Sequence, residues 1–254
     1  MRIGQPYGSS WWRPDQNLNQ MRATFTFIAE LNDFLPHHLQ GTIFTLEFAP
    51  HQSLKHLIES MGVPHTDFGK VLVNDQETDP ATRLREGDRI TVYPADAPIV
   101  GDPHFILDNH LGQLATYLRM LGFDSLYRND YQDEELARVA SQDERTLLTR
   151  DRRLLMRKVI RLGYCIHQTD PRQQAVEVLK RFKMQGQIKP FQRCLRCNSP
   201  LQVVSKQEII DRLEPLTKVY YDDFRICPSC SQVYWKGSHY AHMLEMIEAM
   251  AAQA

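Results

Sequence analysis

The chain has 254 residues, of which 42% are hydrophobic and 24% are charged, and its formal net charge is −1. This is the composition of an ordinary globular protein, and the length suits two or three domains. No apolar run reaches the ~18 residues of a membrane span, and the start of the chain lacks the apolar core of a signal peptide. We therefore expect a cytoplasmic protein with no membrane contact and with a flexible start over residues 1–20.

The first predicted elements combine strands with one helix. Residues 23–29 and 42–48 alternate between apolar and polar side chains, which predicts half-buried strands. Ser53 is expected to cap a short helix that stops at Gly62. Further strands are predicted at residues 71–73 and 89–93. This order of two strands, a helix and two or more strands predicts a small α+β domain over residues 21–94.

That order, together with the sequence RLREGDRI at residues 83–90, resembles the β-grasp fold of ubiquitin-like sulfur carriers of the ThiS and MoaD kind. Such carriers end in a diglycine tail, whereas here Tyr93 continues into a proline-containing segment. Carrier chemistry is therefore not expected, and a role as a sulfur-transfer accessory is the least favoured alternative. We expect a module that docks a protein partner, followed by a stiffened linker over residues 95–103.

The second predicted domain covers residues 104–186 and alternates strands with helices. Short apolar runs at residues 105–107, 123–127, 146–149 and 164–167 are each followed by apolar residues at helical spacing. Such alternation predicts an α/β domain with a parallel sheet covered by helices on both faces. Sheets of this kind bind ligands beyond the carboxyl ends of their strands.

Aspartates stand at these strand ends. Asp108 ends the first strand, Asp130 and Asp133 follow the second, and Asp151 follows the third. Carboxylates that meet at one sheet edge repel one another unless a cation neutralises them, which predicts Mg²⁺ or Mn²⁺. Ions of this kind activate water for attack on a phosphodiester. Each aspartate alone is better explained as a helix cap, but three at successive strand ends of one sheet, beside a basic stretch, favour the metal site.

Positive charge is concentrated in the second half of the chain. Residues 1–103 hold 8 Lys and Arg against 13 Asp and Glu, whereas residues 104–254 hold 22 against 18. Residues 150–196 alone contain 13 basic and 3 acidic residues, which predicts a surface for RNA. The alternative is a set of solvated helix faces. The candidate RNA-binding residues are Arg119, Arg150, Arg152, Arg153 and Lys158.

The last predicted domain, residues 187–254, contains two cysteine pairs, Cys194 with Cys197 and Cys227 with Cys230. Two such pairs present four thiolates to one tetrahedral ion, which predicts a structural zinc site with no open position. A redox disulfide would need only one pair. The nearby Tyr234, Trp235 and His239 either cover the thin core of this ribbon or stack on unpaired bases, and the core is favoured. His239 is not expected to be a further ligand.

Three stretches of the sequence resemble the Mut-seven C-terminal RNase family: residues 108–124, LLTRD at 147–151, and the second cysteine pair with VYWKGSH at 233–239. The resemblance implies a PIN-like nuclease domain with an appended zinc ribbon and, as in some members, a ubiquitin-like domain in front.

The resemblance also implies a metal-dependent ribonuclease that acts on RNA, with acidic residues at Asp108, Asp133 and Asp151 and with both Zn and Mg or Mn as cofactors. A second acid of the PIN pattern has no certain counterpart, and Glu134, Glu135 or Asp130 could take its place. For that reason a catalytically inactive RNA-binding or scaffolding protein is the alternative.

Overall fold

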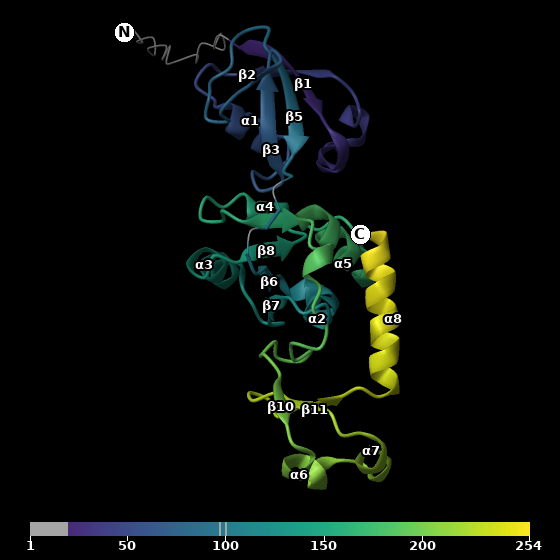
Figure 1. Ribbon diagram of the computed structural model, residues 1–254. Coiled ribbons are helices and arrows are strands. Elements are labelled where there is room, and N and C mark those ends of the chain that lie inside the picture. Colours follow the sequence, from purple (N-terminus) through teal and green to yellow (C-terminus); the bar gives the residue numbers. More distant parts are fainter. Residues whose placement is uncertain (1–19, 97, 100) are drawn as a thin grey trace, which may run out of the picture.

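The computed structural model describes residues 20–254 apart from residues 97 and 100. Figure 1 shows a mixed α/β chain in three parts, with a sheet at one end, a parallel sheet in the middle and a small sheet at the other end. This confirms the predicted fold class. The expected flexible start lies, except for residue 20, outside the described residues. Residues 97 and 100 of the expected linker also lie outside the described residues.

The N-terminal module is a five-stranded sheet with a helix on one side. Its strands lie in the order β2-β1-β5-β3-β4, with β1 and β5 parallel and the other pairs antiparallel. The elements are β1 (Met21–Phe27), β2 (Phe44–Phe48), α1 (Leu54–Ser60), β3 (Phe68–Val73), β4 (Gln76–Glu77) and β5 (Arg89–Pro94). Ser53 caps α1 as predicted, because its side chain accepts a hydrogen bond from the amide of His56.

Two short 3₁₀ turns in this module were not predicted. They are η1 (Ala29–Phe34) and η2 (His37–Leu39), and they lie between β1 and β2. Neither is long enough to display helical periodicity, which is the signal that predicts helices from a sequence. Leu31 and Phe34 of η1 are nevertheless buried, so this connection belongs to the core.

The middle module is a four-stranded parallel sheet in the order β7-β6-β8-β9. Its strands are β6 (His104–Leu107), β7 (Asp124–Tyr127), β8 (Thr146–Thr149) and β9 (Gly163–Cys165). The connections are η3 (Asn109–Leu111), α2 (Gly112–Met120), α3 (Asp133–Gln142) and α4 (Arg152–Leu155), and α5 (Pro171–Phe182) follows β9. The chain leaves β6 for β7 on one side and then crosses to β8 on the other. The crevice between the carboxyl ends of β6 and β8 is therefore the switch point of the sheet.

Helix α4 is shorter than the sequence predicts. The apolar residues Leu154, Leu155, Val159 and Ile160 indicated a longer helix, but α4 ends at Leu155. Val159 is 45% exposed, while Ile160 is buried. Instead of continuing the helix, the chain makes a tight turn in which the amide of Ile160 donates to the carbonyl of Arg157. This turn leaves Val159 at the surface.

The C-terminal part, which we call the cysteine module, is a three-stranded antiparallel sheet that carries both cysteine pairs. Its strands are β10 (Gln202–Val204), β11 (Phe224–Ile226) and β12 (Val233–Trp235), in that order across the sheet. The turn η4 (Gln185–Gln187) precedes it, while α6 (Lys206–Ile209), η5 (Ile210–Arg212) and α7 (Pro215–Tyr220) connect β10 to β11.

The last helix, α8 (Ser238–Gln253), leads from the cysteine module back along the middle module (Figure 1). Its buried residues Ile247 and Met250 join the apolar core formed by α2, α5 and one face of the parallel sheet. The other sheet face, with α3 and α4, shares one continuous apolar cluster with the N-terminal module. Burial of apolar side chains on both faces of the parallel sheet thus holds the three parts together.

Within residues 20–254, except at the two undescribed positions, no helix has both the length and the apolar character needed to cross a membrane.

Candidate functional site

Asp108 and Asp151 lie on the two sides of the switch point and are joined through Thr149. Asp108 follows β6, is 8% exposed, and accepts a 2.6 Å hydrogen bond from the hydroxyl of Thr149 at the end of β8. The same hydroxyl oxygen accepts a 2.9 Å bond from the amide of Asp151. A buried hydroxyl therefore fixes both acidic residues at the carboxyl edge of neighbouring strands.

Both of these carboxylates also cap helical turns. Asp108 accepts from the amide of His110 at 3.2 Å, and Asp151 accepts from the amides of Arg153 and Leu154 at 2.8 and 3.4 Å. In Asp151 a single oxygen, Oδ1, receives both amides. The capping expected for isolated aspartates is thus present, and the two acids also occupy the edge at which parallel sheets bind ligands.

Asp130 and Asp133 are paired with arginines. Asp130 accepts two hydrogen bonds, of 2.8 and 3.0 Å, from the guanidinium of Arg128, and this pairing lowers the pKa of Asp130. Asp133 begins α3 and lies 3.5 Å from the guanidinium of Arg157. Positive side chains therefore neutralise both acids, whereas Asp108 and Asp151 have no such partner in the described chain.

The described residues contain one group of three or more potential metal ligands within 4.8 Å of one another, and it consists of the four cysteines. The structure thus brings Asp108 and Asp151 to one edge, while Asp133 belongs to the separate pair with Arg157. The role of these acids as ligands of Mg²⁺ or Mn²⁺ stays a prediction.

The five candidate RNA-binding residues occupy different environments. Arg119 is 4% exposed and donates to the carbonyls of Ser125, Leu195 and Arg196, so it faces the first cysteine pair rather than solvent. Arg152 donates to the carbonyls of Asp33 and Phe34 in the N-terminal module. These two arginines therefore hold separate parts of the fold together. The side chains of Arg150, Arg153 and Lys158 are exposed.

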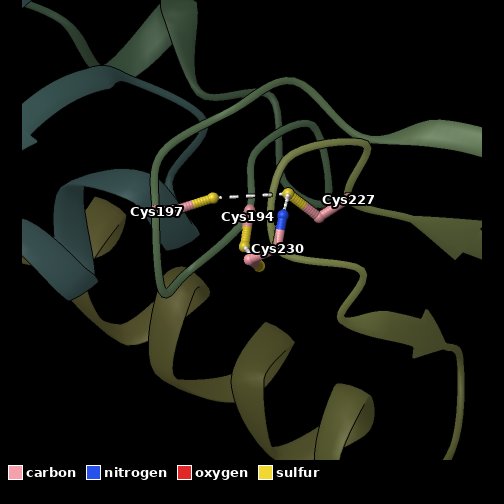
Figure 2. Close-up of side chains that lie close together, drawn as sticks. All are labelled: Cys194, Cys197, Cys227 and Cys230. Carbon is pink, nitrogen blue, oxygen red and sulfur yellow. Dashed lines mark hydrogen bonds between the residues drawn. The ribbon is translucent and has the colours of Figure 1, made fainter.

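The four cysteine sulfurs point toward one centre from two similar turns (Figure 2). In each turn the first cysteine's amide donates to a carbonyl five residues later, Cys194 to Ser199 and Cys227 to Gln232, both at 2.9 Å. Two residues in the left-handed conformation, Asn198 and Ser231, close the turns. The sulfurs of Cys194 and Cys230 lie 3.5 Å apart, and those of Cys197 and Cys227 lie 3.3 Å apart.

The electrostatics of this group fit a divalent cation. At Cys197, desolvation raises the thiol pKa, but hydrogen bonds with Ser199 outweigh it and lower the pKa to about 6. At Cys230, a backbone hydrogen bond with Gln232 lowers the pKa, but desolvation and the other cysteines raise it to about 12. Four thiols this close resist ionising together, and a central Zn²⁺ would remove that repulsion. The donor set therefore fits a structural zinc ion.

Residues that the sequence did not identify hold the cysteine module against the middle module. Asn198 donates to Asp124 at 2.8 Å, and Arg145 and Arg193 also bind that carboxylate. Burial would raise the pKa of Asp124, but hydrogen bonds from Arg145 and Asn198 outweigh it and lower the pKa. Because Asp124 and Asn198 stand 74 residues apart in the chain, no local pattern could have predicted this contact.

Of the aromatic residues near the second cysteine pair, Tyr234 and Trp235 contribute to the cysteine module itself, as the favoured expectation had it, and their stacking on bases stays a prediction. The hydroxyl of Tyr234 contacts the sulfur of Cys194 at 3.2 Å and accepts from the amide of Leu195 at 3.0 Å, so it supports the first cysteine turn. Trp235 is half-buried beside the small core of the cysteine module. His239 is exposed and is not part of the cysteine group.

Comparison with protein families gives two matches. A model described as the Mut7-C RNAse domain matches residues 103–247, and one described as Mut7-C ubiquitin matches residues 20–100. The first match alone covers more than half of the chain. No curated protein and no solved structure matches this sequence.

Proposed function

Because the chain belongs to the Mut7-C RNAse domain family and carries the matching ubiquitin-like domain in front, we propose that it is a metal-dependent ribonuclease. Its proposed reaction is hydrolysis of RNA phosphodiester bonds at the carboxyl edge of β6 and β8. The observation that supports this location most is the placement of Asp108 and Asp151 at the switch point, joined by Thr149.

Asp108 and Asp151 are the proposed ligands of Mg²⁺ or Mn²⁺. Thr149 holds Asp108 by its Oδ2 atom, and the amides of α4 hold Asp151 by its Oδ1 atom. The second oxygen of Asp151 is left for an ion. A bound ion would activate water and offset the negative charge that builds on the phosphate. Asp133 and Asp130 would join this site only by releasing Arg157 and Arg128.

The exposed residues Arg150, Arg153 and Lys158 are the proposed RNA contacts beside these acids. Arg150 and Arg153 immediately flank the Asp151–Arg152 pair, so a phosphate near Asp151 would lie within reach of either guanidinium. Zinc in the cysteine module has a structural role in this proposal, since four thiolates leave no open coordination position.

The test compares RNA cleavage with Mn²⁺ by the wild type and by Asp108→Asn and Asp151→Asn. Asparagine also caps helices, so each substitution removes a charge while keeping the turn. We expect a loss of at least about 100-fold in rate from either change, because each removes an ion ligand. Asp170→Asn is the matched control, since Asp170 caps α5 through two amides but follows β9, away from the switch point.

Full activity in both variants would refute the proposed site. Tight RNA binding without cleavage by the wild type would instead favour the alternative of a catalytically inactive RNA-binding or scaffolding protein. A protein partner of the N-terminal module would have to use the part of its surface that α4 and β9 leave free.

A further inference from the structure

A cavity of about 490 Å³ lies between α2, the cysteine module and the first half of α8. We propose that this cavity binds an unpaired base of the RNA, so that the enzyme acts on strands with a single-stranded segment. This inference rests on the proposed action on RNA and adds the class of substrate. The volume is within the range of cavities that hold small organic ligands.

The walls of the cavity are suited to a flat aromatic ring. Tyr117 of α2, Phe191, Trp235 of β12 and Tyr240 of α8 line it, together with methionines of α2 and α8. Tyr240 and Phe191 form an edge contact with ring centroids 5.0 Å apart, which holds both rings in place. All four rings are only partly buried, and because Arg225 lies over the Phe191 ring, Tyr117, Trp235 and Tyr240 are the rings proposed to receive a base. Aromatic rings of this kind stack on bases without regard to sequence.

The charge of the cavity also suits a base. No carboxylate lines it, in contrast to four further cavities of the described chain that are each lined by at least one. Its one arginine, Arg193, is neutralised by Asp124 at 3.2 Å. The interior therefore favours a neutral group over a phosphate. A polyanion that carries such a group would meet no repulsion from the wall.

A binding place for the adjoining phosphate exists at the rim. Arg172 at the start of α5 is exposed, and its guanidinium lies 3.4 Å from the hydroxyl of Tyr117 and 3.4 Å from the sulfur of Met246. Both of these residues line the cavity. A base held between the rings would thus bring its phosphate next to a positive charge.

The cavity also lies along the helix that begins beside the proposed catalytic edge. Its lining includes successive turns of α2 from Gln113 to Met120, and α2 starts four residues after Asp108. A helix of nine residues is about 13 Å long. A strand anchored in the cavity therefore reaches Asp108 within a few nucleotides. A base paired inside a duplex is stacked on both faces and would not enter.

The first test measures binding of a short fluorescently labelled single strand by anisotropy, in the Asp151→Asn background, with the strand checked for intactness on a denaturing gel. We expect Tyr240→Ala to weaken binding roughly 5- to 100-fold, because it removes one stacking face. Duplex RNA of the same sequence should bind more weakly and should not respond to Tyr240→Ala.

A second pair of variants avoids any loss of packing. Thr116 is an exposed residue of α2 that lines the cavity, so Thr116→Glu adds a carboxylate to the wall while Thr116→Gln adds the same volume without charge. Both residues favour helices. We expect the glutamate variant to bind the single strand about 10-fold more weakly than the glutamine variant.

An abasic strand of equal length and charge separates the base from the phosphates. It should bind more weakly than the normal strand, and Tyr240→Ala should not weaken it further. Equal binding of the two strands, equal binding by the two Thr116 variants, or no RNA binding at all would overturn the proposal. If these effects appear but Asp108→Asn and Asp151→Asn still cleave, the catalytic site is refuted and the base cavity remains.

Discussion

Asp67 is a buried acid that joins the N-terminal module to the middle module. Its side chain is 3% exposed in the loop before β3. One oxygen accepts a 3.0 Å bond from the amide of Cys165 in β9, and the other accepts from the hydroxyl of Thr66. Desolvation raises the pKa of Asp67 from 3.8 to about 6, although these hydrogen bonds and the charges of His167 and Arg181 oppose the rise.

This residue makes stability depend on pH. Because the folded pKa lies above the unfolded value, folding takes up a proton between pH 3.8 and about 6, and stability is lost as the pH rises through this window. The change amounts to at most about 3 kcal/mol. Asp67→Asn keeps the acceptor for Cys165 and should be more stable than the wild type above pH 6. The measurement is the difference between the urea midpoints of the two proteins as a function of pH. Effects of zinc loss, which both proteins share, cancel in this difference. A difference that does not change with pH would contradict the prediction.

At the scale of residues, the sequence predicted the positions of the acids better than their partners. The aspartates after β6 and β8 could be placed because strand ends are visible as the ends of apolar runs. The burial of Arg119 could not be predicted from its place among the basic residues of the sequence, because two of its three acceptors, the carbonyls of Leu195 and Arg196, lie more than 70 residues away. The burial of Asp67 could not be predicted either, because its partner Cys165 is also distant in the sequence.

The end of α2 is fixed by a glycine that lies against the chain leading to the cysteine module. Gly122 has φ of +99°, and a Cβ there would lie 2.2 Å from the carbonyl oxygen of Lys189. The amide of Lys189 in turn donates to the carbonyl of Leu121. No other residue can follow this path closely without displacing the backbone.

Gly122→Ala is therefore expected to destabilise the protein by about 2–4 kcal/mol, through both the clash and the left-handed backbone. Gly186→Ala is the control, because nothing lies within 4 Å of a Cβ at that position. Chemical denaturation of the two variants measures the difference. Equal stability would show that the α2 junction is not rigid.

Helix α4 connects the N-terminal module to the proposed catalytic edge through Arg152. The guanidinium donates to the carbonyls of Phe34 and Asp33 at 2.8 and 3.1 Å and lies 4.8 Å above the Phe34 ring. His167, just beyond β9, contacts the same ring edge to face. The turn η1 thus packs against the element that holds Asp151.

Removing this contact should loosen the N-terminal module. Arg152→Ala is expected to cost about 1–3 kcal/mol, since it removes two charged hydrogen bonds. Arg153→Ala is the matched control, because that neighbouring side chain is exposed and the change should stay within about 0.5 kcal/mol. Limited proteolysis of the segment between the modules reports the loosening, and indistinguishable digestion patterns would count against it.

At the scale of elements, the sequence predicted all strands of the parallel sheet, because each is an apolar run bounded by turn residues. It predicted α4 too long, since apolar residues in a tight turn mimic helical spacing. It gave no detail for α6 and α7, which form the connection between the cysteine pairs. In α7 the apolar residues Leu216 and Val219 are exposed, so they form no buried helical face.

For the whole molecule, metal in the cysteine module is expected to control the order of one end of the chain. The module's own core consists of four buried residues, so it depends on additional support. Zinc analysis should give one ion per chain. Chelation should increase deuterium uptake in β10 to β12 and the first half of α8, while the N-terminal module stays protected. Uniform uptake across all parts would contradict an independent metal-dependent unit.

Arg119 gives this arrangement a wider consequence. Its guanidinium holds the carbonyls of the first cysteine turn and of β7 from a position within α2, the helix that also lines the aromatic cavity. Disorder in the cysteine turn would therefore loosen one wall of the aromatic cavity while Thr149 still holds Asp108 and Asp151 in place, so loss of zinc is expected to weaken the proposed binding of RNA before it disturbs the proposed catalytic edge.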